Sequence, residues 1–159
     1  QERRGYKEGA DAYMAKPFDW DILLYRVRHL LDQQKARIQA FKQTLDVPPT
    51  QLAITSLDET FLNKVVAMVE HNMTNANYTI EALSSDMAMS RVSLYRKVLS
   101  VTGMTPVEFV RLLRLKEGAR LLSEDRFTVA EVADMVGFNS PGYFTKAFKK
   151  AFGKLPTKR

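Results

Sequence analysis

An internal repeat limits the possible folds of this chain more than any other feature of its sequence. At an offset of 49 to 50 residues the chain matches itself in residue type or apolar character: Thr79, Leu83, Ser90, Leu94, Val98 and Gly103 fall on Thr128, Val132, Ser140, Phe144, Phe148 and Gly153. Each copy has the signals of a short helix followed by a second helix that begins at a serine and ends at a glycine. The sequence therefore predicts two tandem helix-turn-helix units.

The second copy contains the residue types that a tight turn between packed helices requires. Ala133 is small where the two helices cross, Gly137 can adopt a positive φ, and Phe138 can fill the angle between the helices. The residue that corresponds to Gly137 in the first copy is Ala88. Because a left-handed backbone costs an alanine about 1 kcal/mol, we expect a less favourable turn there.

The segment between the two copies predicts one continuous helix over Val107 to Leu122, with frequent apolar residues. Such a helix holds the two units at a fixed separation, so that both second helices can enter successive major grooves, roughly 34 Å apart. Gly118 costs this helix about 1 kcal/mol relative to alanine, unless it permits close packing. From Thr79 onward no alternating strand pattern occurs, which indicates a mainly α fold.

The formal net charge of +6 is unevenly distributed along the chain. Residues 138–159 contain no Asp or Glu and several cations: Lys146, Lys149, Lys150, Lys154, Lys158 and Arg159. A positive field of this kind suits a polyanion such as nucleic acid, although a solvated basic face explains the charge alone equally well. The cations occur on the second helix of a helix-turn-helix unit, which favours nucleic acid.

The second helix of the first unit has distinct inner and outer faces. Leu94 and Val98 share the face suited to a core, and the outward positions are Arg91, Val92, Tyr95 and Arg96. The planar guanidinium of Arg96 can donate to two acceptors on a guanine edge. Val92 and Tyr95 can contact thymine methyl groups or sugars; the less favoured alternative is an ordinary, partly exposed helix surface.

The second helix of the second unit differs in chemistry. We expect its aromatic residues, Tyr143 among them, to lie mainly in the core, although the Tyr143 hydroxyl can alternatively reach a phosphate. Its outward positions are Pro141, Gly142, Thr145, Lys146 and Lys149. Because the start of this helix has few long side chains, it favours contacts to phosphates and to DNA shape over direct contacts to bases.

The N-terminal third of the sequence predicts elements that do not belong to the two helix-turn-helix units. A short strand over residues 10–15 and a turn at Lys16 precede a helix from Asp19 to about Gln43, with Asp19 as N-cap. Prolines 48 and 49 then interrupt helix formation. A further helix, capped by Ser56 or Asp58, should run to about residue 72. We therefore divide the chain into residues 1–43, a linker over 44–56, and a DNA-binding domain over 57–159.

Two stretches carry a specific family resemblance. "SRVSLYRKVLSVTGMTPVEFVRLLRLKEGARLL" and "VAEVADMVGFNSPGYFTKAFKKAFGKLP" resemble the DNA-binding domain of the AraC/XylS family of bacterial transcription regulators. The resemblance implies binding to double-stranded promoter DNA and cooperation with RNA polymerase. The candidate DNA-binding residues, from this match and from the outward faces, are Ser90, Arg91, Val92, Tyr95, Arg96, Ser140, Pro141, Gly142, Thr145, Lys146 and Lys149.

The opening segment "EGADAYMAKPFDWDILLYRVRHLL" resembles the last strand and last helix of a response-regulator receiver domain. The resemblance implies that Lys16 is the lysine that contacts a phosphoryl group in an intact receiver. The earlier strands that supply the phosphorylated aspartate are absent from this sequence. A receiver joined to this type of DNA-binding domain resembles the output end of hybrid two-component regulators. This implies a cytoplasmic protein that forms a homodimer through its receiver.

The sequence argues against several other classes of function. It has no cysteine, no glycine-rich phosphate loop and no closely spaced pair of carboxylates, so we expect no enzyme, metal site or cofactor. No apolar run approaches the roughly 20 residues that a membrane span requires, so we expect this fragment to make no membrane contact. The alternative is a protein-interaction or dimerisation module that uses its basic helices on an acidic partner. Sequence-selective, salt-dependent duplex binding distinguishes DNA recognition from this alternative.

Overall fold

The structure, a computed structural model, describes residues 19–45, 47–53 and 55–157. Within these ranges every regular element is helical: α2 (Trp20–Gln43), η1 (Pro49–Leu52), α3 (Ser56–His71), α4 (Ile80–Asp86), α5 (Arg91–Thr102), α6 (Pro106–Ser123), α7 (Val129–Met135) and α8 (Pro141–Phe152). The mainly helical prediction is therefore confirmed. The predicted strand over residues 10–15 and Lys16 lie outside the described residues.

The N- and C-terminal caps of the helices follow from local sequence. The side chains of Ser90 and Ser140 each accept a hydrogen bond from a backbone N–H in the first turn of α5 and α8. Both helices end at a glycine with positive φ, 69° at Gly103 and 73° at Gly153. The repeat seen in the sequence is thus a repeat of structure. For α3 the expected caps were wrong, because Thr55 is the residue whose side chain accepts from the N–H of Asp58.

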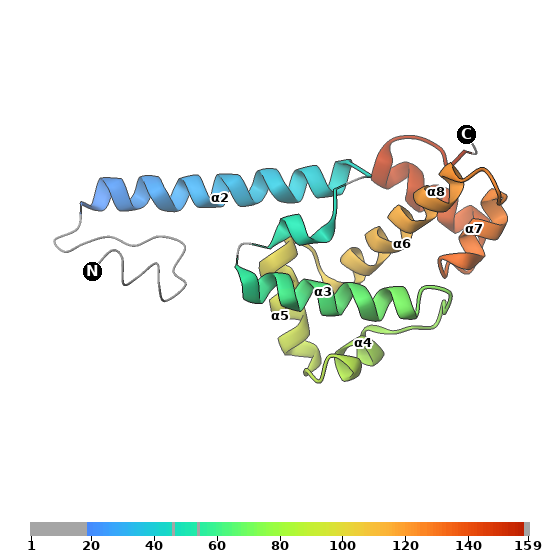
Figure 1. The fold of residues 1–159 in the computed structure, drawn as a ribbon, viewed down its shortest axis with the longest axis horizontal. Coiled ribbons are helices and arrows are strands. Elements are labelled where there is room, and N and C mark those ends of the chain that lie inside the picture. Colours follow the sequence, from blue (N-terminus) through green and yellow to red (C-terminus); the bar gives the residue numbers. More distant parts are fainter. Residues whose placement is uncertain (1–18, 46, 54, 158–159) are drawn as a thin grey trace.

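Two helix pairs, α4 with α5 and α7 with α8, flank the central helix α6 (Figure 1). The expected continuous connecting helix is confirmed, and most of its surface is buried between the pairs. Gly118 lies where α6 meets α8. A Cβ atom at Gly118 would stand 2.9 Å from the ring of Phe144, so glycine allows these helices to pack closely.

Arg114, in the middle of α6, joins the two helix pairs. Its side chain is 7% exposed, and its guanidinium donates to the carbonyl oxygens of Met73 at 2.7 Å, Val136 at 2.8 Å and Asn75 at 3.1 Å. Burial lowers the pKa of Arg114 from its usual value. These bonds satisfy carbonyls in the α3–α4 connection and at the end of α7, so the buried charge fixes both loops on α6.

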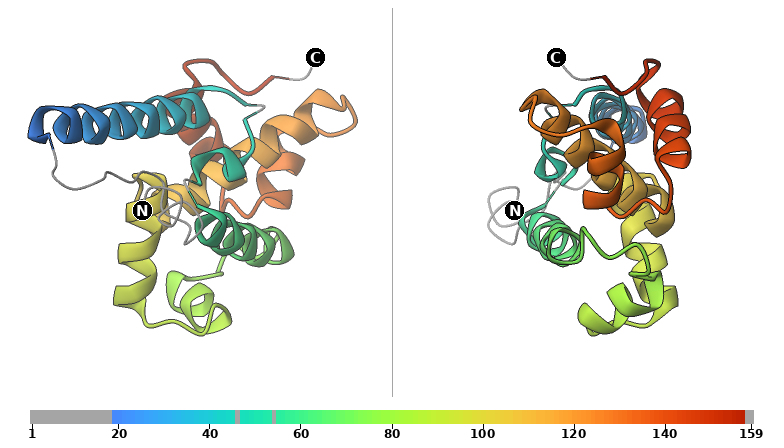
Figure 2. Two further views of the ribbon diagram at one scale, coloured as in Figure 1. Left: turned by 60° about the vertical axis from the view of Figure 1, so that its left-hand side comes forward. Right: turned by 90° about the vertical axis from the view of Figure 1, so that its right-hand side faces the viewer.

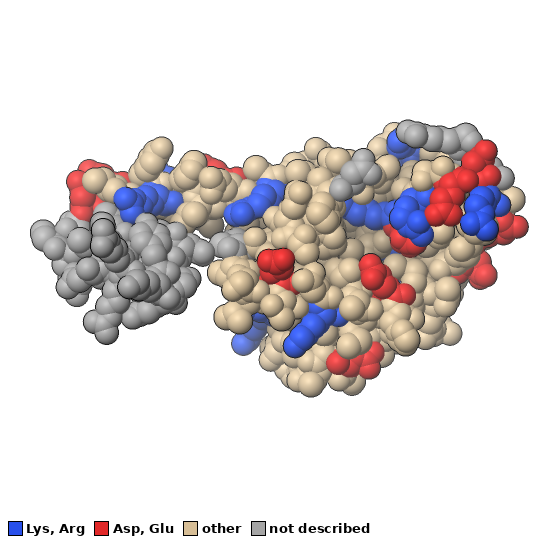
Figure 3. Space-filling model, in the orientation of Figure 1, with Lys and Arg blue, Asp and Glu red and all other residues tan. Residues whose placement is uncertain are grey.

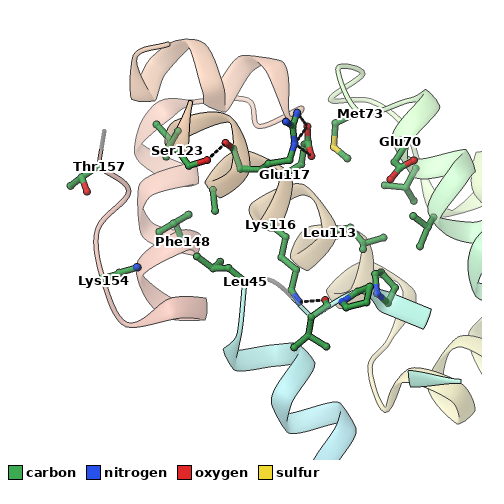
Figure 4. Close-up of a pocket in the computed structure, with 18 of the residues that line it drawn as sticks. Leu45, Glu70, Met73, Leu113, Lys116, Glu117, Ser123, Phe148, Lys154 and Thr157 are labelled. Carbon is green, nitrogen blue, oxygen red and sulfur yellow. Dashed lines mark hydrogen bonds and ion pairs between the residues drawn. The ribbon is translucent and has the colours of Figure 1, made fainter. Parts of the chain in front are cut away.

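The C-terminal end of α2 packs against the same core. Phe41 is fully buried, and the Lys116 ammonium lies 3.5 Å from the centre of its ring. The ammonium also donates to the carbonyls of Thr44 at 3.0 Å and Val47 at 3.3 Å, and Figure 4 shows it pointing toward this linker. The N-terminal half of α2 extends beyond the rest of the domain (Figure 1). The division at residue 43 stays a prediction, but the last turns of α2 share a core with the helices that follow.

Candidate DNA-binding surface

The second helices of the two units lie on one side of the molecule. Figure 2, in its right-hand view, shows α5 and α8 on the same side, with α3 on the opposite side. On the face that carries α3, acidic and basic side chains of the described residues are interspersed (Figure 3). Both helices thus direct their outer surfaces away from this mixed face.

The α5 helix presents a partly apolar outer face. Leu94 and Val98 are fully buried, as expected from their spacing. Val92 and Tyr95 are 60% and 47% exposed, and Arg96 is also exposed. Leu99, at 41% exposed, extends this face by one turn. The outer surface of α5 therefore combines one guanidinium with three side chains suited to apolar contact.

Two other candidates at the start of α5 have structural partners. The Ser90 hydroxyl caps the helix through the N–H of Ser93 at 3.1 Å. The Arg91 guanidinium forms an ion pair with Glu81 of α4 at 2.9 Å, with both side chains more than half exposed. Exposed pairs of this kind contribute about 0–1 kcal/mol, so Arg91 remains available to exchange the carboxylate for a phosphate.

The α8 helix presents a surface of different character. Pro141, Gly142, Lys146 and Lys149 are exposed, and Thr145 is half-buried. A Cβ atom at Gly142 would meet nothing within 4 Å, so backbone is open to solvent there. The Ser140 hydroxyl accepts from the N–H of Tyr143 and caps the helix. The start of α8 can approach a polyanion closely.

The prediction that Tyr143 lies in the core was wrong. Its ring packs 5.6 Å from that of Phe138, but the residue is 49% exposed. Phe144 and Phe148, in contrast, are buried, with Phe138 edge-on to Phe144 at 5.2 Å between ring centroids. Tyr143 therefore belongs to the outer surface of α8, where its hydroxyl can reach a ligand.

The turns between the helices confirm the expected difference between the units. Gly137 has φ of 78°, and Ala88 has φ of 54°, a value that alanine rarely adopts. Gly137 is also needed for space, because a Cβ atom there would overlap Nη1 of Arg114 and stand 2.7 Å from the Met73 carbonyl oxygen. Ala88 is exposed, so its turn carries strain without such crowding.

Three cations on the outer faces of α5 and α8 have no partner within the described part of the chain. Among the described residues no hydrogen bond or ion pair joins Arg96, Lys146 or Lys149. Arg120, in contrast, binds Glu117 and Glu124, each at 2.7 Å, and hydrogen bonding to Glu117 is the main reason that the pKa of Arg120 is raised. The free cations on α5 and α8 therefore lie where the recognition faces were expected.

The sequence analysis did not identify the structural role of Arg114. Helical spacing could have indicated this role, because Arg114 shares one face of α6 with Val110, Gly118 and Leu121, and all of these residues are buried. A cation on a buried face requires partners, and here backbone carbonyls supply them.

Residues 19–45, 47–53 and 55–157 contain no cluster of His, Asp and Glu side chains suited to a metal ion. Within the same ranges, no helix combines the length and apolar character that crossing a bilayer requires.

Comparison with known proteins gives a consistent set of relatives. A family described as a helix-turn-helix domain matches residues 83–158. The chain is 34% identical over 153 residues to Histidine kinase P4 of Formosa agariphila, covering 96% of this chain and 11% of that protein. It is 32% identical over 101 residues to the probable transcription factor PqrA of Proteus vulgaris, covering 63% of this chain and 83% of PqrA. For Histidine kinase P4 and three further curated relatives, the chain spans between 11% and 37% of the length of the matched protein.

A solved structure agrees with these matches. The DNA-binding domain of the global transcriptional factor AdpA, in complex with a target DNA, is 30% identical with a TM-score of 0.55. The match covers 59% of this chain and 84% of that domain. PqrA and AdpA both have names of transcription factors rather than of enzymes.

Proposed function

Because the chain belongs to the AraC family of helix-turn-helix DNA-binding transcription regulators, we propose that it binds a two-part promoter site through α5 and α8 in successive major grooves. The observation that carries this proposal is the position of α5 and α8 on one side of the molecule, with unpaired cations on both outer faces. The central helix α6 holds the two units together through a buried core, which suits binding to a site of fixed spacing.

In this proposal α5 supplies most of the base recognition. Arg96 donates two hydrogen bonds to a guanine, while Val92 and Tyr95 contact thymine methyl groups or sugars beside it. The exposure of all three side chains supports these roles. Ser90 and Arg91, at the start of α5, contact the adjacent phosphates.

The α8 helix mainly binds the DNA backbone. Ser140, Pro141 and Gly142 form an uncrowded helix start that approaches a phosphate, and Lys146 and Lys149 add charge along the helix. Thr145, which is half-buried on this helix, contributes a base or sugar contact through its hydroxyl. A site of this kind selects sequence chiefly through DNA shape.

We also propose that the chain is the output end of a two-component phosphorelay in the bacterial cytoplasm. Its support is the similarity to Histidine kinase P4, which spans nearly the whole chain, including the segment before the helix-turn-helix match. In the intact protein, residues 1–43 would complete a receiver containing Lys16. Pairing of phosphorylated receivers would form a homodimer and raise DNA affinity through effective concentration, for recruitment of RNA polymerase.

The DNA-binding proposal is tested by selecting duplexes from a random pool with the 159-residue chain and then measuring affinity by fluorescence anisotropy. Arg96→Ala should weaken binding by about 5- to 150-fold and relax one base position. Lys149→Ala should weaken binding to all sequences alike and lower the salt slope by about 1. Lys64→Ala is the matched control, because Lys64 is an exposed cation on α3, opposite the recognition helices.

Enrichment of one two-part site would support the proposal that α5 and α8 bind successive major grooves. If binding does not depend on DNA sequence, and Arg96→Ala and Lys64→Ala have the same DNA affinity, the proposal is rejected. The alternative, a protein-interaction or dimerisation module, is then favoured. The phosphorelay proposal needs a separate measurement, since a full-length protein whose DNA affinity does not change on phosphorylation would contradict it.

A further inference from the structure

A second cationic feature lies beside the recognition helices. A groove of about 360 Å³ opens between the end of α2, the middle of α6 and the last turns of α8. Three cations from three different helices line it: Lys42, Arg111 and Lys150. Its floor is apolar, with Leu112 and Ala147 among its residues. None of these cations belongs to the outward faces described above.

The positive charge of this groove is not compensated within the described structure. No hydrogen bond or ion pair joins Lys42, Arg111 or Lys150 to another described residue. The groove contains one carboxylate, Glu108, which accepts from the N–H of Thr105 at 3.0 Å in the capping box of α6. Three cations against one engaged carboxylate leave a net positive site that can bind an anion.

The position of the groove relates it to the two units. Lys150 lies four residues after Lys146 on α8, so both project from the same side of that helix. Arg111 projects from α6, the helix that connects α5 with the second unit. The groove therefore adjoins the outer face of α8 at the junction between the two recognition helices.

The lysine from α2 is held in place by its neighbours. Phe41, the preceding residue, is fully buried and anchored by the Lys116 ammonium. Further up the helix, the Gln34 amide donates to the Ser100 carbonyl at the end of α5, at 3.2 Å. Because both ends of this half of α2 are tied to the domain, Lys42 has a defined place in the groove.

We propose that this groove binds DNA phosphates between the two half-sites, so that α2 contributes to DNA binding although it precedes the helix-turn-helix match. The inference rests on the proposed function and adds a third contact region, made by Lys42, Arg111 and Lys150. Its ligand is the sugar-phosphate backbone rather than base edges. Binding there depends on charge and spacing and is independent of the intervening sequence.

The test measures the salt dependence of affinity for the selected duplex with the 159-residue chain. Lys42→Ala, Arg111→Ala and Lys150→Ala should each lower the slope of log K against log salt by up to about 0.9 and leave the base preference unchanged. Lys64→Ala on α3 is the matched control and should leave the slope unchanged. Glu108→Gln keeps the capping box and removes the opposing charge, so it should tighten binding.

A second measurement identifies the phosphates. Uncharged methylphosphonates are placed one at a time between the half-sites. At one position the methylphosphonate should lower the DNA affinity of the wild type, but it should not lower the affinity of Arg111→Ala any further. Suppose that Lys42→Ala, Arg111→Ala and Lys150→Ala show the same salt slope as Lys64→Ala, while Arg96→Ala still reduces the preference at one base position. The groove proposal is then wrong and the proposed function stands. If the wild type shows no sequence selectivity, the proposed function itself fails.

Discussion

Replacement of Gly137 by alanine should destabilise the domain far more than a typical turn substitution. At φ of 78°, the left-handed backbone alone costs alanine about 1–2 kcal/mol. The new Cβ would also overlap Nη1 of Arg114, which donates to the carbonyls of Met73 at 2.7 Å and Val136 at 2.8 Å. Hydrogen bonds to charged groups contribute about 1.5–3 kcal/mol each and are not additive, so displacing Arg114 adds roughly 3 kcal/mol.

The combined loss is therefore about 4–5 kcal/mol, a large part of the roughly 5–15 kcal/mol that stabilises a typical domain. Urea denaturation followed by circular dichroism measures it as a lower midpoint. Ala88→Gly is the matched control, because it relieves the φ of 54° in the corresponding turn of the first unit and should stabilise by about 0.5–1 kcal/mol. A loss below about 2 kcal/mol for Gly137→Ala would refute the role assigned to the Arg114 contacts.

Three further substitutions test the packing and the electrostatics of the domain. Phe41→Ala should cost about 3–5 kcal/mol in denaturant unfolding, because a fully buried ring is lost from the α2 anchor; a loss below 1 kcal/mol would mean that α2 does not belong to the core. Gly118→Ala should cost about 1–3 kcal/mol by the same measurement, since its Cβ would crowd Phe144 at 2.9 Å; an unchanged midpoint would contradict close packing of α6 on α8. Burial, and then the 2.6 Å hydrogen bond to Asp86, raise the pKa of Tyr78 above its usual value of 10, so the folded state holds this proton more tightly. The resulting stability is complete below about pH 10 and is lost as pH rises further. The free energy of unfolding, measured from pH 8 to 11, should therefore fall more steeply with pH for the wild type than for Tyr78→Phe. Parallel curves for the two proteins would contradict this.

Local signals determined the helices because each signal acts within a few residues. The serine caps at 90 and 140 and the glycine ends at 103 and 153 satisfy terminal backbone groups of their own helices, so spacing alone located α5 and α8. Apolar periodicity likewise identified Leu94 and Val98 as buried. The caps of α3 were misassigned because Thr55, Ser56 and Asp58 all have side chains that can cap, and only the backbone conformation selects one.

The recognition faces were predicted less completely. Tyr143 follows the aromatic pattern of α8, but it lies one residue off the face shared by the buried Phe144 and Phe148, and it is 49% exposed. Thr145 was expected outside and is half-buried. Both residues border the buried Phe144 and Phe148 face of α8, where residue type alone does not decide how much of a side chain is covered.

The sequence by itself determined the two helix-turn-helix units and the connecting helix, because these depend on periodicity and on contacts close along the chain. Only the tertiary structure brought Arg114 to the carbonyls of Met73 and Val136, and placed Lys42 beside Arg111 and Lys150. These groups are separated by about 20 to 110 residues in the chain. Their proximity follows from the burial of Phe41 and the central helix in a shared core, a long-range result that no local pattern encodes.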